Sequence, residues 1–372
     1  MIFIILFTGL ITGLYAFLIL SFSKGWENIP EISTHHRTRE RVFISVIIPF
    51  RNECHNLKEL IENITQQSFS THHLEVVMVD DHSRDQGPEH LEQLQKSHHW
   101  LKVVESEGAG KKEALRHGIS TATGELVITT DADCRFGKDW LQTIAEAYLD
   151  SSPDMLVMPV SMDTGRNKLS RFQQIEYLAL QMTTAGAFGI GKPFLCSGAN
   201  LAFRKKSFLE AARFAKGRQY LSGDDVFLLQ AFKKQNFRIK YLRSPQAMVK
   251  TTPAPSLRDF FVQRMRWSGK SPAYQDNFAR QTALLILLTN AWAAILPFLS
   301  AISTIFAAVW AAMMIIKAVV DRKLLNAGNR FFSVRIKAGN FIVFSLLYPF
   351  YALITGLGSL LFKEKWKERT GK

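Results

Sequence analysis

The sequence predicts an α/β domain with a doubly wound, mostly parallel sheet, attached to a membrane by helices at both ends of the chain. Two observations predict this. Short apolar runs alternate with helical stretches between residues 43 and 130, which is the pattern of repeated strand–helix–strand units. Residues 1–23, 281–316 and 338–362 contain no charged side chain. Each of these stretches is long enough to cross a hydrocarbon layer of roughly 30 Å at about 1.5 Å per residue.

The soluble domain is predicted to span residues 43–270. Its first strand is Phe43–Pro49, a nearly continuous apolar run typical of a strand buried on both faces of a parallel sheet. Further strands are expected at Leu74–Val79, 101–105, Leu126–Thr129 and Met155–Pro159. Helices are expected near 56–66, 88–97, 112–119 and 168–184, with an amphipathic segment at Phe260–Trp267.

Polar side chains follow three of the predicted strands: Arg51 and Glu53, Asp80 and Asp81, and Asp131 and Asp133. In doubly wound sheets ligands bind beyond the carboxyl ends of the strands, so we expect these side chains to line one site. Alternation along a strand would turn Asp131 and Asp133 to the same side. Paired carboxylates suit Mg²⁺ or Mn²⁺, especially where substrate phosphates complete the ligand shell. The alternative interpretation of a single Asp-x-Asp is a polar cap at the end of a strand, with no bound cation.

Lys and Arg number 46 against 32 Asp and Glu, which gives a formal charge of +14. This balance favours an anionic partner, such as phosphorylated substrates, an anionic membrane face or nucleic acid. The cations gather beside the apolar stretches, in the linker 24–42, the connector 317–337 and the tail 363–372. Because membrane attachment explains that placement, no nucleic-acid partner is expected. The three cysteines lie far apart in the sequence, so they are expected to be reduced thiols.

Membrane topology is predicted from the flanking charges. Residues 1–23 lack a basic leader and a small-residue cleavage site, so they are interpreted as a permanent anchor. The basic linker 24–42 then places the following domain in the cytoplasm, at the inner membrane of the cell. The stretch 281–316 has 36 residues and contains Pro297 near its middle, which favours a hairpin.

For the C-terminal tail, the number of predicted membrane crossings and the distribution of basic residues lead to opposite predictions. A hairpin followed by a further span over 338–362 would put the tail 363–372 outside. That tail has five basic and two acidic residues, and a basic segment is expected on the cytoplasmic side. Either the last segment re-enters around Pro349 and Gly356, or the stretch 281–316 crosses only once. The sequence leaves both interpretations open.

The later half of the chain adds further candidates. Asp224 and Asp225 begin a predicted helix, where Asp225 could act as a general base or the pair could simply cap the helix. Lys111 could bind phosphate or lie on a solvated face. Arg266 could contact phosphate in a bidentate manner and Trp267 could stack on a sugar, or both could anchor the chain at a membrane interface. Every histidine precedes residue 118, which excludes a histidine base in the later half.

Several short motifs occur in a fixed order between residues 43 and 270: Val46–Glu53, Val79–Asp85, Gly110–Leu115, Asp131–Asp133, Cys196–Asn200, Gly223–Asp225 and Gln263–Trp267. In this order the chain resembles the family 2 glycosyltransferases, which are membrane-bound enzymes. The resemblance implies the GT-A fold, a Rossmann-like domain that binds nucleotide-diphosphate sugars. It also implies inverting transfer from a UDP- or GDP-sugar with Mg²⁺ or Mn²⁺.

The resemblance assigns roles to several of the matched positions. Glu53, Asp80, Asp81 and Lys111 would bind the nucleotide, and Arg266 would meet the pyrophosphate. Asp133 would be the direct metal ligand, with Asp131 assisting it and contacting the donor. Asp225 would be the catalytic base, supported by Asp224, and Gln263 and Trp267 would bind the acceptor. Three positions depart from the family pattern: Asp224 where Glu is commoner, and His82 and Lys112 where Gly is usual.

Four functions remain in competition. The preferred one is transfer of single sugars to a lipid or glycan acceptor at the cytoplasmic face. The Gln-x-x-Arg-Trp motif also fits a processive polysaccharide synthase, although such enzymes usually have more membrane spans. A sugar-phosphate nucleotidylyltransferase would leave Gln263–Trp267 and the apolar segments unexplained. A non-enzymatic, membrane-attached binding module would not require Asp133 or Asp225.

Overall fold

The computed structural model describes residues 1–32, 42–165, 167–212, 224–270, 273–361, 365–366 and 369–370. The chain divides into two compact units. The helical unit comprises Met1–Ile29, Met162–Phe194 and Pro253–Lys363. The sheet unit comprises Pro30–Ser161, Leu195–Thr252 and Glu364–Lys372. The predicted soluble stretch 43–270 is therefore shared between two units, because residues 162–194 and 253–270 pack with the apolar helices.

The sheet unit is built on a seven-stranded sheet with the order β3-β2-β1-β4-β8-β6-β9. Its strands are β1 (Ile44–Phe50), β2 (Leu74–Asp80), β3 (Leu101–Glu105), β4 (Leu126–Thr129), β6 (Met155–Val157), β8 (Leu201–Arg204) and β9 (Ile239–Tyr241). Strands β1 to β4 are parallel, and β8 is antiparallel to both of its neighbours. All residues of β1 are buried, as its apolar run predicts. The predicted α/β domain with a mostly parallel sheet is confirmed.

Smaller elements complete this unit. A three-stranded sheet has the order β5 (Arg135–Phe136), β10 (Val249–Thr251) and β7 (Val160–Met162). Strands β11 (Lys365–Trp366) and β12 (Arg369–Thr370) pair with each other. The helices are α2 (Cys54–Thr65), α3 (Gly87–Gln95), α4 (Lys111–Thr121), α5 (Trp140–Ser151), α7 (Lys205–Ala212) and α8 (Asp224–Lys234), with a 3₁₀ turn at Thr71–His73.

Helix α4 lies directly against the sheet, and a glycine allows this. A Cβ atom on Gly118 would lie 2.6 Å from Cγ2 of Ile47 and 2.7 Å from Cγ2 of Val79. Such distances are shorter than any real packing contact, so a larger residue would push the helix away from β1 and β2. The N-terminus of α4, which carries Lys111, is placed at the carboxyl end of β2 by the hydrogen bond from the N–H of Gly110 to Asp81.

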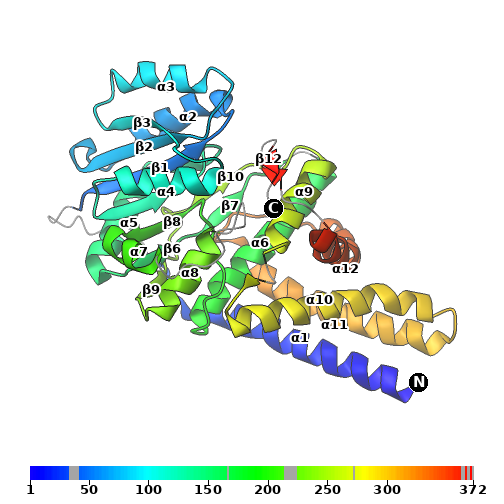
Figure 1. The fold of residues 1–372 in the computed structure, drawn as a ribbon. Coiled ribbons are helices and arrows are strands. Elements are labelled where there is room, and N and C mark those ends of the chain that lie inside the picture. Colours follow the sequence, from blue (N-terminus) through cyan, green and yellow to red (C-terminus); the bar gives the residue numbers. More distant parts are fainter. Residues whose placement is uncertain are drawn as a thin grey trace. The chain divides into compact units, whose positions relative to one another are not determined.

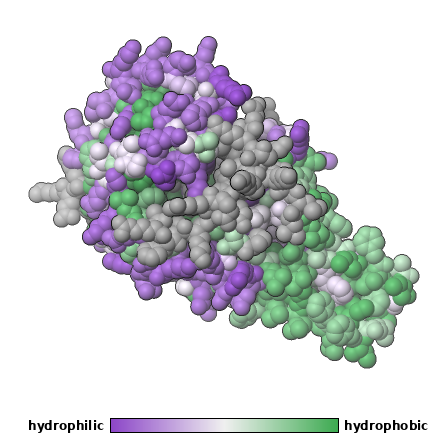
Figure 2. Space-filling model, in the orientation of Figure 1, coloured by the Kyte–Doolittle hydropathy of each residue, from purple (hydrophilic) through white to green (hydrophobic). Residues whose placement is uncertain are grey.

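The helical unit contains α1 (Ile2–Asn28), α6 (Lys168–Gly189), α9 (Leu257–Ser268), α10 (Asn277–Leu299), α11 (Thr304–Asn329) and α12 (Ala338–Leu361). Four of them, α1, α10, α11 and α12, are long and apolar enough to cross a membrane. The surface of this unit is hydrophobic along α1, α10 and α11 (Figure 2). Helices α1 and α6 are in backbone contact, since a Cβ atom on Gly25 would lie 2.0 Å from the carbonyl oxygen of Gly186.

The stretch 281–316 contains parts of two helices, α10 and α11, as a hairpin requires, and the hairpin stays the preferred prediction for this stretch. The turn between them lies at residues 300–303, and Pro297 is inside the last turn of α10. Helix α11 continues to Asn329, well into the basic stretch 317–337. It can continue there because Lys317 and Asp321 are buried and form an ion pair of 2.6 Å, which neutralises both charges within the unit.

Helix α12 is continuous across Pro349 and Gly356, so no break for re-entry occurs at either residue. Figure 1 shows α12 nearly end-on, whereas α1, α10 and α11 of the same unit lie lengthwise beside one another. A stripe of exposed apolar side chains runs along it: Ile342, Leu346, Phe350, Ile354 and Leu357. Its length and apolar composition suit a crossing, whereas its direction across α1, α10 and α11 favours a position along the membrane interface. That position would remove the topological conflict of the basic tail.

We therefore expect the tail to lie on the same side of the membrane as the linker 24–42. The measurement is labelling of single cysteines with an impermeant maleimide in right-side-out and inverted vesicles. Cysteines placed after Lys372 and in the linker should react in the same vesicles, and Ser300→Cys, in the turn between α10 and α11, should react in the opposite ones. If the tail cysteine reacts together with Ser300→Cys, α12 crosses the membrane.

Candidate active site

The sheet order brings the three predicted polar strand ends together. Strand β1 lies between β2 and β4, with Phe50 paired to Asp80 and Ile47 paired to Thr129. The segments that follow β1, β2 and β4 therefore emerge side by side at one edge. Their polar side chains share this edge because parallel strands end in the same direction.

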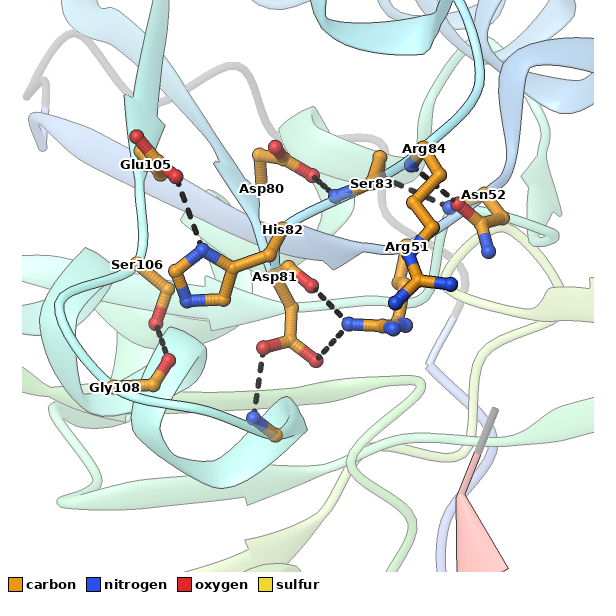
Figure 3. Close-up of polar contacts among 11 residues, drawn as sticks. Arg51, Asn52, Asp80, Asp81, His82, Ser83, Arg84, Glu105, Ser106 and Gly108 are labelled. Carbon is orange, nitrogen blue, oxygen red and sulfur yellow. Dashed lines mark hydrogen bonds and ion pairs between the residues drawn. The ribbon is translucent and has the colours of Figure 1, made fainter. Parts of the chain in front are cut away.

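Asp81, directly after β2, links the segment that follows β1 to the loop that precedes α4 (Figure 3). Its side chain is fully buried, and Oδ1 accepts a hydrogen bond of 2.7 Å from the backbone N–H of Gly110, just before α4. Arg51 Nη1 donates to the carbonyl oxygen of Asp81 at 2.7 Å and lies 3.9 Å from its carboxylate. The Asp81 carboxylate thus holds the loop that begins α4. This contact gives Asp81 a structural role beside the nucleotide contact that the resemblance implies.

The turn after β2 explains one departure from the family pattern. His82 has a φ of 54°, a left-handed conformation that glycine adopts most readily. Its Nδ1 lies 3.0 Å from Oε1 of Glu105 (Figure 3), a side-chain contact that glycine could not make. Asp80 Oδ1 accepts from the N–H of Ser83 at 2.9 Å and so closes the same turn.

Lys111 and Asp131 form an ion pair at the head of α4. Their side chains are 26% and 31% exposed, so both are reachable from solvent. Glu53 Oε2 accepts a hydrogen bond of 2.7 Å from Asn56 at the start of α2. A cationic side chain is therefore already placed beside the Asp-x-Asp pair, where a phosphate group would need one.

Asp131-Ala-Asp133 does not continue strand β4. The strand ends at Thr129 and a turn follows, in which the N–H of Cys134 donates to the carbonyl oxygen of Asp131 at 3.1 Å. The two carboxylates are thus brought together by this turn, and the expectation from strand alternation is wrong. Thr251 Oγ1, on the neighbouring β10, donates to Oδ2 of Asp133 at 3.4 Å.

Burial, and the negative charges of Asp131 and Glu53, raise the pKa of Asp133 to about 6. Such a concentration of carboxylates in a partly desolvated place is one that a divalent cation would stabilise. Among the described residues, no group of three or more His, Cys, Asp and Glu side chains could hold a metal unaided. The site fits Mg²⁺ or Mn²⁺ provided that phosphate oxygens and water supply the remaining ligands.

Asp225 is connected to the same edge of the sheet. It is the second residue of α8, and its Oδ2 accepts from the N–H of Gly198 at 2.9 Å while Oδ1 accepts from the N–H of Val226 at 2.8 Å. The carbonyl oxygen of Gly198 accepts from Oγ1 of Thr129, the last residue of β4, at 2.8 Å. The side chain of Asp224 lies outside the described part of the structure.

Asn200 fixes the loop that carries Gly198, a role that the sequence did not reveal. It is completely buried, and its Nδ2 donates to the carbonyl oxygens of Pro159 and Ala247, each at 2.8 Å. Its Oδ1 accepts from Nε1 of Trp140 at 3.1 Å. Because both Nδ2 and Oδ1 of Asn200 form hydrogen bonds, the loop is held in one orientation. The loop in turn orients Asp225 through the N–H of Gly198.

The predicted acceptor residues Gln263 and Trp267, and Arg266 with them, lie on α9 in the helical unit. Arg264, between them, was not singled out from the sequence. Its side chain is 2% exposed and contacts Glu176 of α6 at 2.6 Å. The available sequence signal was Glu176 itself, a single carboxylate within the mostly apolar run Ile175–Leu180.

Comparison with known proteins identifies the sheet region. Residues 45–210 match the family described as glycosyl transferase family 2. They form a glycosyltransferase family 2 domain. The matched region of this domain begins in β1, contains the polar ends of β1, β2 and β4, and ends within α7.

Two curated relatives match the chain over about three-fifths of its length. An N-acetylglucosaminyltransferase of Bradyrhizobium diazoefficiens is 26% identical over 247 residues, which are 63% of this chain and 50% of the relative. A poly-beta-1,6-N-acetyl-D-glucosamine synthase of Staphylococcus aureus is 25% identical over 234 residues, 60% of this chain and 53% of the relative. The chain thus spans about half the length of these relatives.

A solved structure shares the fold of the chain. It is the mannosyltransferase PcManGT from Pyrobaculum calidifontis, in complex with GDP-Man and Mn²⁺. The TM-score is 0.57 at 20% identity, and the alignment covers 96% of this chain and 97% of the other. The predicted GT-A fold is thereby confirmed.

Proposed function

We propose that the protein transfers a sugar, with inversion, from a nucleoside diphosphate sugar to a hydroxyl group of a lipid or glycan acceptor at the membrane surface. The observation that carries this proposal is the common sheet edge of Lys111, Asp131, Asp133 and the loop that holds Asp225. At this edge, Lys111 and the Asp131–Asp133 turn provide charged groups for a diphosphate and its cation. The loop provides a fixed carboxylate, that of Asp225. The family 2 domain and its glycosyltransferase relatives support the same reaction.

On the donor side, the chain would bind the diphosphate through Lys111 and the Asp131–Asp133 turn. A divalent cation held by Asp133, with Asp131, would stabilise the negative charge of the departing diphosphate. The Mn²⁺ and GDP-Man of the mannosyltransferase with the same fold support a cation and a nucleotide-sugar here. The buried pair of Asp81 and Arg51 keeps the N-terminus of α4, and so Lys111, in place.

On the acceptor side, Asp225 would take the proton of the attacking hydroxyl group. The oxygen–carbon bond forms at the anomeric carbon on the face opposite to the bond that breaks toward the diphosphate, which inverts the configuration. Asp225 is suited to this role because the N–H groups of Gly198 and Val226 fix its carboxylate. Gln263 and Trp267 would bind the acceptor and Arg266 the pyrophosphate, as their motif implies.

The test is donor turnover by the purified protein in detergent with Mn²⁺, using GDP-mannose and UDP-N-acetylglucosamine as probes. Turnover of at least one donor, with release of the nucleoside diphosphate and stimulation by a membrane lipid extract, is expected. Release of pyrophosphate would instead indicate a nucleotidylyltransferase. A folded protein that turns over no nucleotide-sugar, with or without lipid, would overturn the proposal.

A processive synthase is the second candidate, favoured by the similarity to the poly-beta-1,6-N-acetyl-D-glucosamine synthase. The same reaction with radiolabelled donor separates the two functions. Single transfer gives one labelled product of fixed size, whereas a synthase gives a series of lengthening products. We favour single transfer because four helices of the described chain are long and apolar enough to cross the membrane, and one of them runs across the others.

A further inference from the structure

The helical unit contains a buried ion pair next to the acceptor motif. Arg264 of α9 and Glu176 of α6 have side chains that are 2% and 9% exposed. Arg264 Nη2 lies 2.6 Å from Oε2 of Glu176, and Nε lies 3.2 Å from Oε1 and 3.1 Å from Oε2. The hydroxyl group of Tyr351, on α12, donates to Oε1 of Glu176 at 3.0 Å. One carboxylate therefore connects three helices.

The guanidinium group of Arg264 also contacts both residues that the motif assigns to the acceptor. It donates a hydrogen bond to Oε1 of Gln263, and its central carbon lies 4.2 Å from the ring centroid of Trp267. The same carbon lies 4.9 Å from the ring centroid of Phe260. Arg264 and Trp267 are three residues apart on one helix, so their side chains share a face. The planar cation is thereby held between two aromatic rings.

Stability alone does not account for such a pair. Two charges lose their hydration when they are buried, and well-packed apolar side chains of similar volume are often equally stable in their place. What an ion pair with several hydrogen bonds adds is a fixed direction, because a guanidinium group binds a carboxylate in a planar geometry. Here the ion pair fixes the orientation of the planar guanidinium group of Arg264, which contacts the ring of Trp267.

We propose that Glu176 and Arg264 are positioning residues for the acceptor side of the site. Glu176 fixes the plane of the Arg264 guanidinium group, and Arg264 holds Gln263 and Trp267 in the orientation that receives the acceptor. This inference rests on the proposed function, in which Gln263 and Trp267 bind the acceptor. Tyr351 extends the arrangement to α12, the helix with the exposed apolar stripe.

The alternative is a simple structural link between α6, α9 and α12, and two variants separate these roles. Arg264→Lys keeps the charge that neutralises Glu176 but loses the planar group under Trp267. Glu176→Gln keeps the length of the side chain but loses the charge that orients Arg264. If the pair only links helices, Arg264→Lys should behave as the wild type. If it positions the motif, both variants should impair the acceptor side.

Two measurements are made on each variant of the full chain in detergent. The first is nucleoside diphosphate release with Mn²⁺ and whichever donor, GDP-mannose or UDP-N-acetylglucosamine, the wild type turns over, with and without membrane lipid extract. We expect the lipid-stimulated rate to fall roughly 10- to 100-fold, the effect of misplacing a substrate-orienting group, while lipid-independent hydrolysis is unchanged. The second is fluorine NMR of fluorotryptophan-labelled protein, in which Trp267→Phe identifies one of seven tryptophan signals. That signal should shift in both variants.

The matched control is Asp321→Asn, which breaks a second buried pair of the helical unit, Lys317–Asp321, on α11. Thermal unfolding should show destabilisation of the same kind as in Glu176→Gln, with wild-type lipid stimulation and an unchanged Trp267 signal. The inference is overturned if Asp321→Asn gives the same loss of transfer, or if Arg264→Lys keeps the wild-type rate and the wild-type signal. If the wild type turns over no donor, the proposed function fails, and the Trp267 signal still decides whether the pair positions that ring.

Discussion

Asp225→Asn is expected to reduce glycosyl transfer by roughly 100- to 10,000-fold, the usual contribution of a general base. The side chain keeps its size but can no longer accept a proton from the acceptor hydroxyl group. Donor binding should be retained, because the Asp131–Asp133 turn and Lys111 are unchanged. The measurements are the transfer rate with lipid extract and the binding of the nucleoside diphosphate by calorimetry.

Asparagine at this position also disturbs one of the two backbone hydrogen bonds that Asp225 accepts, from Gly198 and Val226. The control is therefore a carboxylate held in a similar way. Asp154, which lies outside the matched motifs, accepts from the N–H of Arg238 at 2.9 Å and from Oγ of Ser207 at 2.5 Å. Asp154→Asn should lose comparable thermal stability and keep its transfer rate. Equal activity of Asp225→Asn and the wild type would remove Asp225 from the mechanism.

Asp133→Asn is expected to lower Mn²⁺-dependent donor turnover by at least about 100-fold, since it removes electrostatic stabilisation of the leaving group. The loss should appear at every donor concentration and should not be restored by excess Mn²⁺. Binding is measured separately as the rise in unfolding temperature when Mn²⁺ and nucleoside diphosphate are added together. The wild type should show this rise, EDTA should abolish it, and the variant should lack it.

A surface carboxylate nearby provides the control for Asp133. Glu59 is 50% exposed and forms an ion pair of 2.7 Å with Arg135, two residues after Asp133 in the chain. Glu59→Gln should leave both turnover and the metal-dependent stabilisation unchanged. A metal-dependent rise of unfolding temperature that survives in Asp133→Asn would show that the cation binds elsewhere.

The elements around the donor site could be predicted because their signals are local. Strand Leu126–Thr129 has the predicted bounds, and β1 differs from its prediction by one residue at each end. Continuous apolar runs followed by polar residues are sufficient to define buried parallel strands and their carboxyl ends. The turn at Asp131–Asp133 was not predicted, since a short polar segment can continue a strand or leave it, and only the packing with Thr251 and Cys134 decides.

The sequence by itself thus determined the α/β sheet, the order of its polar strand ends, and the long apolar helices. Only the tertiary structure decided which side chains those helices bring together. Glu176 and Arg264 are 88 residues apart in the chain, and Tyr15 donates to Asp321 across 306 residues. A charge in an apolar helix is stable only beside its partner. A local sequence pattern does not identify a partner that is distant in the chain. The ion pairs of the helical unit can therefore be recognised only in the folded structure.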